Sequence, residues 1–299
     1  MEFENLPQST NVEDRRGQSG GSGFSLGAGT GGLGIGAIVI IFVISYFTGI
    51  NPQVLMSGAQ IVTGAGNGVS TASAPMQSSP SGQAVPANDQ TAHFLAKILG
   101  GTEAVWAQVL PAQKGIQYVN VKLVLFNGAT DSGCGTAQSA MGPFYCPNDK
   151  KVYLDTSFFN EMQSKYGGGG DFAYAYVVAH EIGHHVQDLM GILDKVDAAK
   201  QNASRTQANA LSVRVELMAD CLAGVWAYNA NAQYRLLDPG DIEKAMATAS
   251  AIGDDKLQTA ARGYAVPDSF THGSAAMRQQ WLTTGLKSGQ IDSCNTFAQ

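Results

Sequence analysis

The stretch DFAYAYVVAHEIGHHVQDLM, residues 171–190, decides how the rest of the chain is interpreted. Asp171 is a good N-cap residue, and Gly191 stands where helices commonly end in the left-handed conformation. We therefore expect one helix from about Phe172 to Met190. The HEIGH motif at residues 180–184 falls within this helix, where positions four apart lie on the same face.

His180 and His184 differ by about 40° in azimuth on such a helix, so both imidazoles can reach a single metal ion. Glu181 is turned about 100° from His180, which places its carboxylate beside the metal, where it can take a proton from water. His185 is turned roughly 140° from His180, and we expect it to pack or to support the ligands. The alternative is that the two histidines are core residues without a metal.

A second pair of acidic residues follows in the segment RVELMADC, residues 214–221. Glu216 and Asp220 are four apart on another predicted helix, so they share one face of a largely apolar segment. Burying two acids there is costly unless a cation meets them. We expect Glu216 to complete a His₂Glu zinc site, with one Zn²⁺ per chain, and Asp220 to bond the free ring nitrogen of one histidine. The alternative is a surface ion pair between Glu216 and Arg214 or another basic residue.

Composition excludes some functions. The chain has 299 residues, of which 44% are apolar and 14% are charged, and its net charge is −6. This balance argues against a non-specific nucleic-acid binder, whose surface would carry a basic surplus. We therefore expect no nucleic-acid partner.

The segment before residue 89 is expected to lie outside the folded domain. Residues 1–32 are glycine-rich in their second half and predict a disordered cytoplasmic tail. Residues 33–50, LGIGAIVIIFVISYFTGI, carry no charge, and their length is about the shortest that spans a bilayer as a helix. Residues 51–88, rich in Gly, Ser, Ala, Gln and Pro, predict a flexible linker. The domain is expected to occupy residues 89–299.

Basic residues beside the apolar run predict its orientation. Arg15 and Arg16 precede it, whereas no Lys or Arg follows it before Lys97. By the positive-inside rule, the N-terminus is cytoplasmic and the domain is periplasmic or extracellular, on a single-pass anchor in the inner (plasma) membrane. The lipid bilayer would then be a partner. The alternatives are a signal peptide cleaved near residues 72–74, although this site lies far past the apolar run, and a buried core helix.

The four cysteines are Cys134, Cys146, Cys221 and Cys294. An even number in an exported domain predicts disulfides, and four cysteines allow three pairings. The first two flank a short segment that can begin a hairpin, so we expect them to pair, which leaves Cys221 with Cys294. In a cytosolic protein, four buried free thiols would be the alternative.

Hydrophobic periodicity predicts a mostly helical domain with a small β-sheet, an α+β fold. Alternating or β-branched runs predict strands at residues 117–126 and 151–154. Periodic apolar residues and capping signals predict further helices at residues 91–99, 102–110, 156–166, 210–228, 239–251 and 275–286.

Several motifs in combination resemble a known family. They are HEIGHH at 180–185, ELMAD at 216–220, GCG and GPFYCP between residues 133 and 147, YLD at 153–155 and SFTHG at 269–273. Along nearly its whole length the chain resembles the predicted neutral zinc metallopeptidases of bacteria, and more distantly the gluzincin core of membrane-associated metallopeptidases. The resemblance implies a zincin-like metallopeptidase domain, bound zinc, and a protein or peptide substrate.

The resemblance and the ligand spacing share a mechanism. Zinc on His180, His184 and Glu216 would polarise a peptide carbonyl and acidify a water molecule. Glu181 would take the proton from this water as general base and pass it to the leaving amine. Given the expected orientation, the natural substrates are proteins or peptides of the cell envelope, with peptidoglycan cross-links as the alternative.

The mechanism also needs a donor that stabilises the tetrahedral oxyanion. We expect His272, which follows a turn and precedes a helix, with Arg278 as the second candidate. Tyr145 and Tyr153 are further candidates by position alone. The strand at residues 151–154 is a candidate sheet edge along which a substrate could align.

Two other classes of protein fit parts of the pattern. A di-iron carboxylate protein would need a second Glu-x-x-His, and the chain has only the one that begins at Glu181. A non-catalytic, zinc-stabilised exported scaffold or binding module would need metal ligands alone, and would have no use for an unliganded carboxylate at Glu181.

Overall fold

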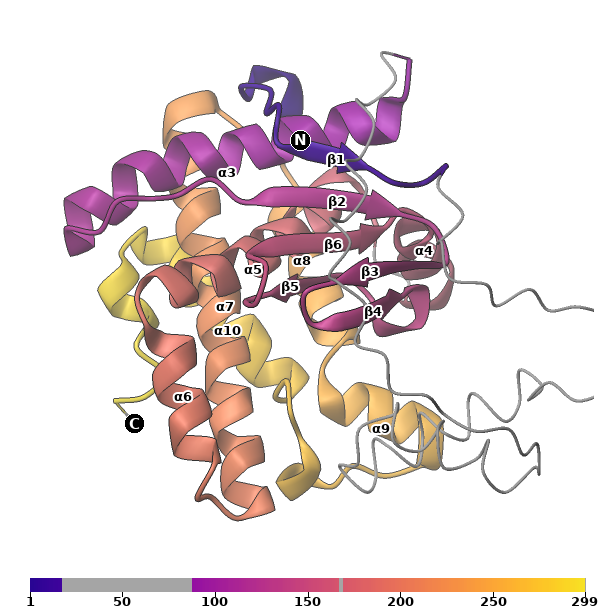
Figure 1. The fold of residues 1–299 in the computed structure, drawn as a ribbon, viewed down its shortest axis with the longest axis vertical. Coiled ribbons are helices and arrows are strands. Elements are labelled where there is room, and N and C mark those ends of the chain that lie inside the picture. The colour runs from indigo at the N-terminus through magenta and orange to yellow at the C-terminus, as the bar shows by residue number, and fades with distance from the viewer. Residues whose placement is uncertain (18–87, 167–168, 299) are drawn as a thin grey trace, which may run out of the picture. The chain divides into compact units, whose positions relative to one another are not determined.

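The computed structural model describes residues 1–17, 88–166 and 169–298 (Figure 1). These residues are mostly helical with two small sheets, which confirms the predicted α+β class. The helices are α3 (Gln90–Lys114), α4 (Ser157–Tyr166), α5 (Asp171–Leu189), α6 (Ile192–Lys200), α7 (Arg205–Tyr234), α8 (Asp241–Ala251), α9 (Asp254–Arg262) and α10 (Ala275–Ser288), with 3₁₀ turns η1 (Phe3–Asn5), η2 (Ser139–Met141), η3 (Pro267–Ser269) and η4 (Ile291–Cys294). The strands are β1 (Val12–Asp14), β2 (Lys122–Phe126), β3 (Ala129–Ser132), β4 (Gly135–Gln138), β5 (Phe144–Cys146) and β6 (Lys151–Asp155).

The main sheet has the strand order β1-β2-β6-β5 (Figure 1). β1 and β2 are parallel, as are β2 and β6, whereas β5 runs antiparallel to β6. The expectation that residues 151–154 form a sheet edge is therefore wrong, because β6 has a hydrogen-bonded neighbour on each side. Among the described strands, β5 is the edge at that end of the sheet.

Residues 1–17 correct the expected disordered tail of residues 1–32. They begin with the turn η1, and β1 then pairs with β2 in the register Val12↔Leu123. Leu6 is 1% exposed, and the Ser9 backbone N–H donates to the Ala96 carbonyl of α3 at 2.9 Å. Backbone hydrogen bonds and apolar burial thus make this segment part of the same folded unit as the chain from residue 88 onward.

Two glycines in the middle of α3 receive the N-terminal segment. A Cβ at Gly100 would lie 2.2 Å from the Pro7 carbonyl oxygen, and one at Gly101 would lie 2.9 Å from the Leu6 side chain. The sequence predicted two helices, at residues 91–99 and 102–110, on either side of this pair. The structure has one helix, because close packing compensates for the low helix propensity of glycine.

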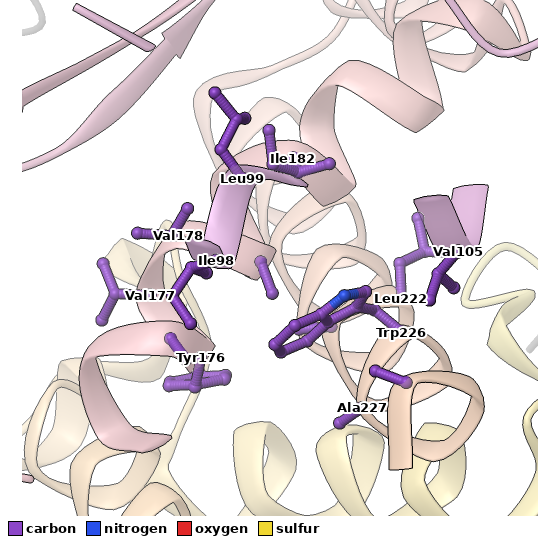
Figure 2. Close-up of a cluster of buried hydrophobic side chains, with 14 of the residues drawn as sticks. Ile98, Leu99, Val105, Tyr176, Val177, Val178, Ile182, Leu222, Trp226 and Ala227 are labelled. Atoms are coloured by element: carbon purple, nitrogen blue, oxygen red, sulfur yellow. The ribbon is translucent and has the colours of Figure 1, made fainter. Parts of the chain in front are cut away.

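The three helices that carry the core are α3, α5 and α7, whose apolar side chains pack together (Figure 2). At the centre, α5 approaches α7 closely, since a Cβ at Gly183 would lie 3.1 Å from the Ala219 carbonyl oxygen. This contact brings the HEIGH segment of α5 opposite the ELMAD segment of α7. The labelled members of the cluster in Figure 2 are Ile98, Leu99, Val105, Tyr176, Val177, Val178, Ile182, Leu222, Trp226 and Ala227.

Helix α10 packs on α7 through a similar close approach. A Cβ at Gly285 would lie 1.9 Å from the Cys221 carbonyl oxygen. Both predicted disulfides are formed: Cys221 pairs with Cys294 beside this contact, and Cys134 pairs with Cys146 across the β3–β4 hairpin and β5.

The expected membrane span at residues 33–50 and nearly all of the expected linker at 51–88 lie outside the described residues. Within residues 1–17, 88–166 and 169–298, no helix has both the length and the apolar character that a bilayer crossing requires. The pairing of β1 with β2 conflicts with the expected single-pass orientation, however. A single membrane crossing between the two strands would place them on opposite sides of the bilayer, where they could not pair.

Candidate metal centre

Three side chains from α5 and α7 form a candidate metal site. His180, His184 and Glu216 each offer one ligand atom, and these atoms all lie within 4.8 Å of one another. The His180 Nε2 atom is 3.1 Å from Glu216 Oε2, and the His184 Nε2 atom is 3.6 Å from Glu216 Oε1. The two imidazoles therefore face one carboxylate through their Nε2 atoms, as the helical spacing predicted.

The other nitrogen of each imidazole is held by a buried partner. His180 Nδ1 lies 2.8 Å from Asp220 Oδ1, and His184 Nδ1 lies 2.9 Å from Gln187 Oε1. The Gln187 amide donates to the Val215 carbonyl at 2.7 Å, so its oxygen must be the acceptor for His184. Both Nδ1 atoms then carry the proton, which leaves both Nε2 lone pairs for a metal.

Asp220 is fully buried and is held in its ionised form. It accepts two bonds from Arg278, at 2.8 and 2.9 Å, and one from the Tyr176 hydroxyl at 2.5 Å. Burial alone would raise the pKa of Asp220, but Arg278 and His180 outweigh it and hold that pKa far below its ordinary value. An ionised Asp220 fixes the tautomer of His180.

The two glutamates of the site have pKa values shifted in opposite directions. Burial raises the pKa of Glu216, but the neighbouring His184 and His180 outweigh it and lower that pKa well below its ordinary value. Burial raises the pKa of Glu181, and this effect prevails over the two histidines. Glu216 thus remains an anionic ligand, whereas Glu181 is shifted toward the range in which a carboxylate exchanges protons.

The donor set and the charge balance of the site fit zinc. Two imidazoles and one carboxylate are the ligands of many catalytic zinc sites, which keep their fourth position open to solvent or substrate. Among the described residues that line the cleft, the two carboxylates are those of Glu181 and Glu216. The guanidinium of Arg278 does not balance their charge, because it is bound to Asp220. Clustered carboxylates of this kind are stabilised by a bound cation.

His272 lies at the same cleft, on the loop between η3 and α10. Its side chain is 51% exposed, and its Nδ1 atom lies 3.4 Å from Asp254 Oδ1. The other oxygen of Asp254 accepts from the backbone N–H groups of Thr271, His272 and Gly273, at 2.7, 2.6 and 3.0 Å. Asp254 therefore holds the whole loop. No sequence signal indicates this role, because the sequence analysis does not predict α9, which Asp254 begins.

Arg278 lines the cleft but is not a free donor. Its guanidinium binds Asp220 and is 3.3 Å from the Tyr176 hydroxyl.

Tyr145 also lines the cleft, and its hydroxyl is 2.7 Å from Asp188 and 3.1 Å from His185 Nδ1. The Tyr153 hydroxyl instead donates to Asp149 at 2.6 Å. Of the expected oxyanion donors, only His272 combines a place at the cleft with an exposed side chain.

The fold and this site define the class of protein: an α+β protein in which two helices bring together a set of ligands that fits a zinc metallopeptidase. The chain belongs to the family described as "Putative neutral zinc metallopeptidase", whose sequence model matches residues 1–297. The resemblance inferred from the motifs is thereby confirmed.

Relatives extend over most of the chain. YpfJ of Escherichia coli K12, named as an uncharacterized protein, is 43% identical over 305 residues, covering 100% of this chain and 99% of its own length. Rv2575 of Mycobacterium tuberculosis H37Rv, also named as uncharacterized, is 44% identical over 206 residues, covering 66% of this chain and 67% of its own length. No solved structure matches the chain.

Proposed function

We propose that this protein hydrolyses peptide bonds with one zinc ion held by His180, His184 and Glu216, and with Glu181 as the general base. The observation that carries the proposal is the placement of Glu181. This residue is 8% exposed, lines the cleft beside the three ligands, and is not itself a member of the ligand set. A structural zinc site has no use for such a carboxylate.

When bound, zinc would polarise a substrate carbonyl and lower the pKa of a water molecule. The protein's own groups do the rest. Glu181 accepts the proton of the attacking water and later donates it to the leaving amine. Its raised pKa suits both transfers better than an ordinary carboxylate, because the base must give the proton back.

His272 is the proposed donor to the tetrahedral oxyanion. Burial lowers its pKa, but Asp254 and Glu216 outweigh that effect and raise it, which favours the protonated, donating form. Asp254 acts through His272 and is a positioning residue. Arg278 holds Asp220, and through it His180, rather than touching the substrate.

The two disulfides support a location outside the cytoplasm for residues 89–299, because disulfides persist in oxidising compartments. The charge-free residues 33–50 support an association with the inner membrane of a bacterium that leaves residues 1–17 and 88–298 on the same side of the bilayer, as the pairing of β1 with β2 requires. The protein would then act on protein or peptide of the cell envelope.

The test compares Glu181→Gln with Glu243→Gln, a matched change on α8 outside the cleft. The Glu181→Gln protein should still bind one zinc per chain, whereas its cleavage of a diverse peptide library should fall by about 10²–10⁴-fold. Glu243→Gln should alter neither. Undiminished cleavage by Glu181→Gln would refute the base assignment. Stoichiometric zinc without cleavage by the unaltered protein would favour the scaffold function.

A further inference from the structure

The walls of the cleft around the metal centre are largely apolar. The cleft has a volume of about 450 Å³, within the range of sites for small molecules and short peptide segments. Apolar side chains from η2, β5 and α4 form one part of its lining, and side chains from α6 and α9 form another. They include Met141, Phe144, Phe158, Leu193 and Leu257.

Two of these apolar side chains are unusually exposed. Met141 on η2 is 54% exposed, and Leu257 on α9 is 37% exposed. Both side chains line the cleft together with Phe144, Phe158 and Leu193, so they belong to one apolar lining and are not scattered single residues. Exposed apolar side chains beside a reactive centre are typical of a surface that receives an apolar ligand.

The guanidinium of Arg278 and the Nδ1 atom of His272 are bound by carboxylates, and the rest of the His272 ring is the proposed donor to the oxyanion. Arg278 is held bidentately by Asp220, and His272 is held by Asp254. An enzyme that removes residues from a chain end needs a cation for the terminal carboxylate or an anion for the terminal amine. Among the described residues that line this cleft, the carboxylates are Glu181 and Glu216, and both belong to the metal centre.

We propose that the cleft takes an internal, uncharged stretch of polypeptide with apolar side chains next to the cleaved bond, and that Met141 and Leu257 determine this specificity. This inference rests on the proposed peptidase function. The reaction consumes one water molecule and breaks one internal C–N bond. The hydroxyl goes to the carbonyl carbon, and the proton goes to the new amine, so two shorter peptides result.

The experiment uses the full-length, zinc-loaded protein and two peptide libraries with the same sequences. One library has free ends, and the other is acetylated at the N-terminus and amidated at the C-terminus. Mass spectrometry should find the same internal cleavages in both, with apolar side chains at the flanking positions. Cleavage confined to free-ended peptides, at the terminal one or two residues, would overturn the inference but leave the peptidase function standing. Cleavage of neither library would refute the peptidase function, and the inference with it.

Specificity is tested with Leu257→Lys and Met141→Lys, and with Ile242→Lys as the matched control. Ile242 on α8 is 39% exposed, close to the exposure of Leu257, and it lies away from the cleft. Each rim variant should lower kcat/KM for apolar peptides by about tenfold, and should raise relative cleavage of peptides with an acidic side chain at the same position. Ile242→Lys should change neither. Equal preference profiles for all three variants would overturn the assignment of Met141 and Leu257.

Discussion

Two regions of this protein depend on buried charged groups, and they differ in how the sequence encodes them. In the metal centre, Asp220 on α7 is held by Arg278 and holds His180 of α5. In the N-terminal segment, Glu13 of β1 lies 2.7 Å from Arg15 and 3.1 Å from Lys151 of β6. Both clusters join segments that are distant in the sequence.

The metal centre follows from helical periodicity, whereas the N-terminal cluster follows from strand register. A helix fixes which residues share a face, so two motifs with four-residue spacing suffice to predict one site. A three-residue strand has no comparable period, and its partner β2 lies more than a hundred residues away. Breaking each cluster should therefore have consequences of different size.

The largest expected effect is that of Arg278→Met. This change leaves Asp220 buried without its guanidinium partner, and removing one member of a buried ion pair typically costs about 3–5 kcal/mol. The free energy of unfolding, measured by urea denaturation of the metal-free protein, should fall by about that amount.

Lys287→Met is the control for that measurement, because Lys287 is an exposed cation on the same helix. It should change the free energy of unfolding by less than about 0.5 kcal/mol. Adding Asp220→Asn to Arg278→Met should recover part of the loss, since the uncompensated charge is then removed. A loss below about 1 kcal/mol for Arg278→Met would contradict the buried ion pair.

The placement of the candidate metal ligands side by side could be predicted from the sequence, and the groups that support them only in part. His180, Glu181, His184, Glu216 and Asp220 follow from spacing on two helices. Gln187 could have been found three residues after His184 on the same face, but glutamine is too common in helices to single out. The contact between Asp254 and His272 could not have been found from the sequence, because it depends on the conformation of a loop.

The fold was predictable where periodicity is strong. Helices α5, α7 and α10 lie near their expected ranges, whereas the sequence analysis predicts no helix at α6 or α9. The N-terminal strand was missed because the glycine-rich sequence that follows it dominates the composition of residues 1–32. The glycine pair at Gly100 and Gly101 was a signal of close packing, yet it does not say which segment packs there.

Gly100→Ala should sharpen this comparison, because the sign of its effect on the free energy of unfolding depends on whether residues 1–17 are present. In the full-length chain the new methyl group would collide with the Pro7 carbonyl, so we expect a destabilisation of about 1–3 kcal/mol. In a chain that lacks residues 1–17 the same change replaces glycine by alanine in an open helix position. It should then stabilise the protein by about 0.5–1 kcal/mol.

The measurement is the urea unfolding free energy of four proteins: both chain lengths, each with and without the substitution. An equal shift in the two chain lengths would contradict docking of the N-terminal segment on α3. Such a result is what a single membrane crossing at residues 33–50 would require, since residues 1–17 would then be separated from α3. Stability changes of opposite sign in the two chain lengths require residues 1–17 and α3 to lie on the same side of the membrane.

The smallest expected effect is the pH dependence that Glu13 contributes. Burial raises the pKa of Glu13, but hydrogen bonds from Arg15 and Lys151 outweigh it, and the folded-state pKa lies below the ordinary value of 4.5. A carboxylate of this kind stabilises the fold above its ordinary pKa, and the contribution is lost as the pH falls through the folded-state value. Glu13→Gln should therefore destabilise the protein at pH 7, by about 1 kcal/mol or less.

The difference between the unaltered protein and Glu13→Gln should shrink as the pH is lowered below about 4.5, because the unaltered protein loses the same interaction by protonation. Urea midpoints at pH 7, 5 and 3.5 measure it, with Glu243→Gln as the exposed control. A difference that stays constant over this range would mean that packing of the Glu13 side chain, rather than its charge, holds β1 in the sheet. The two regions would then differ in their use of buried charge as well as in how the sequence encodes them.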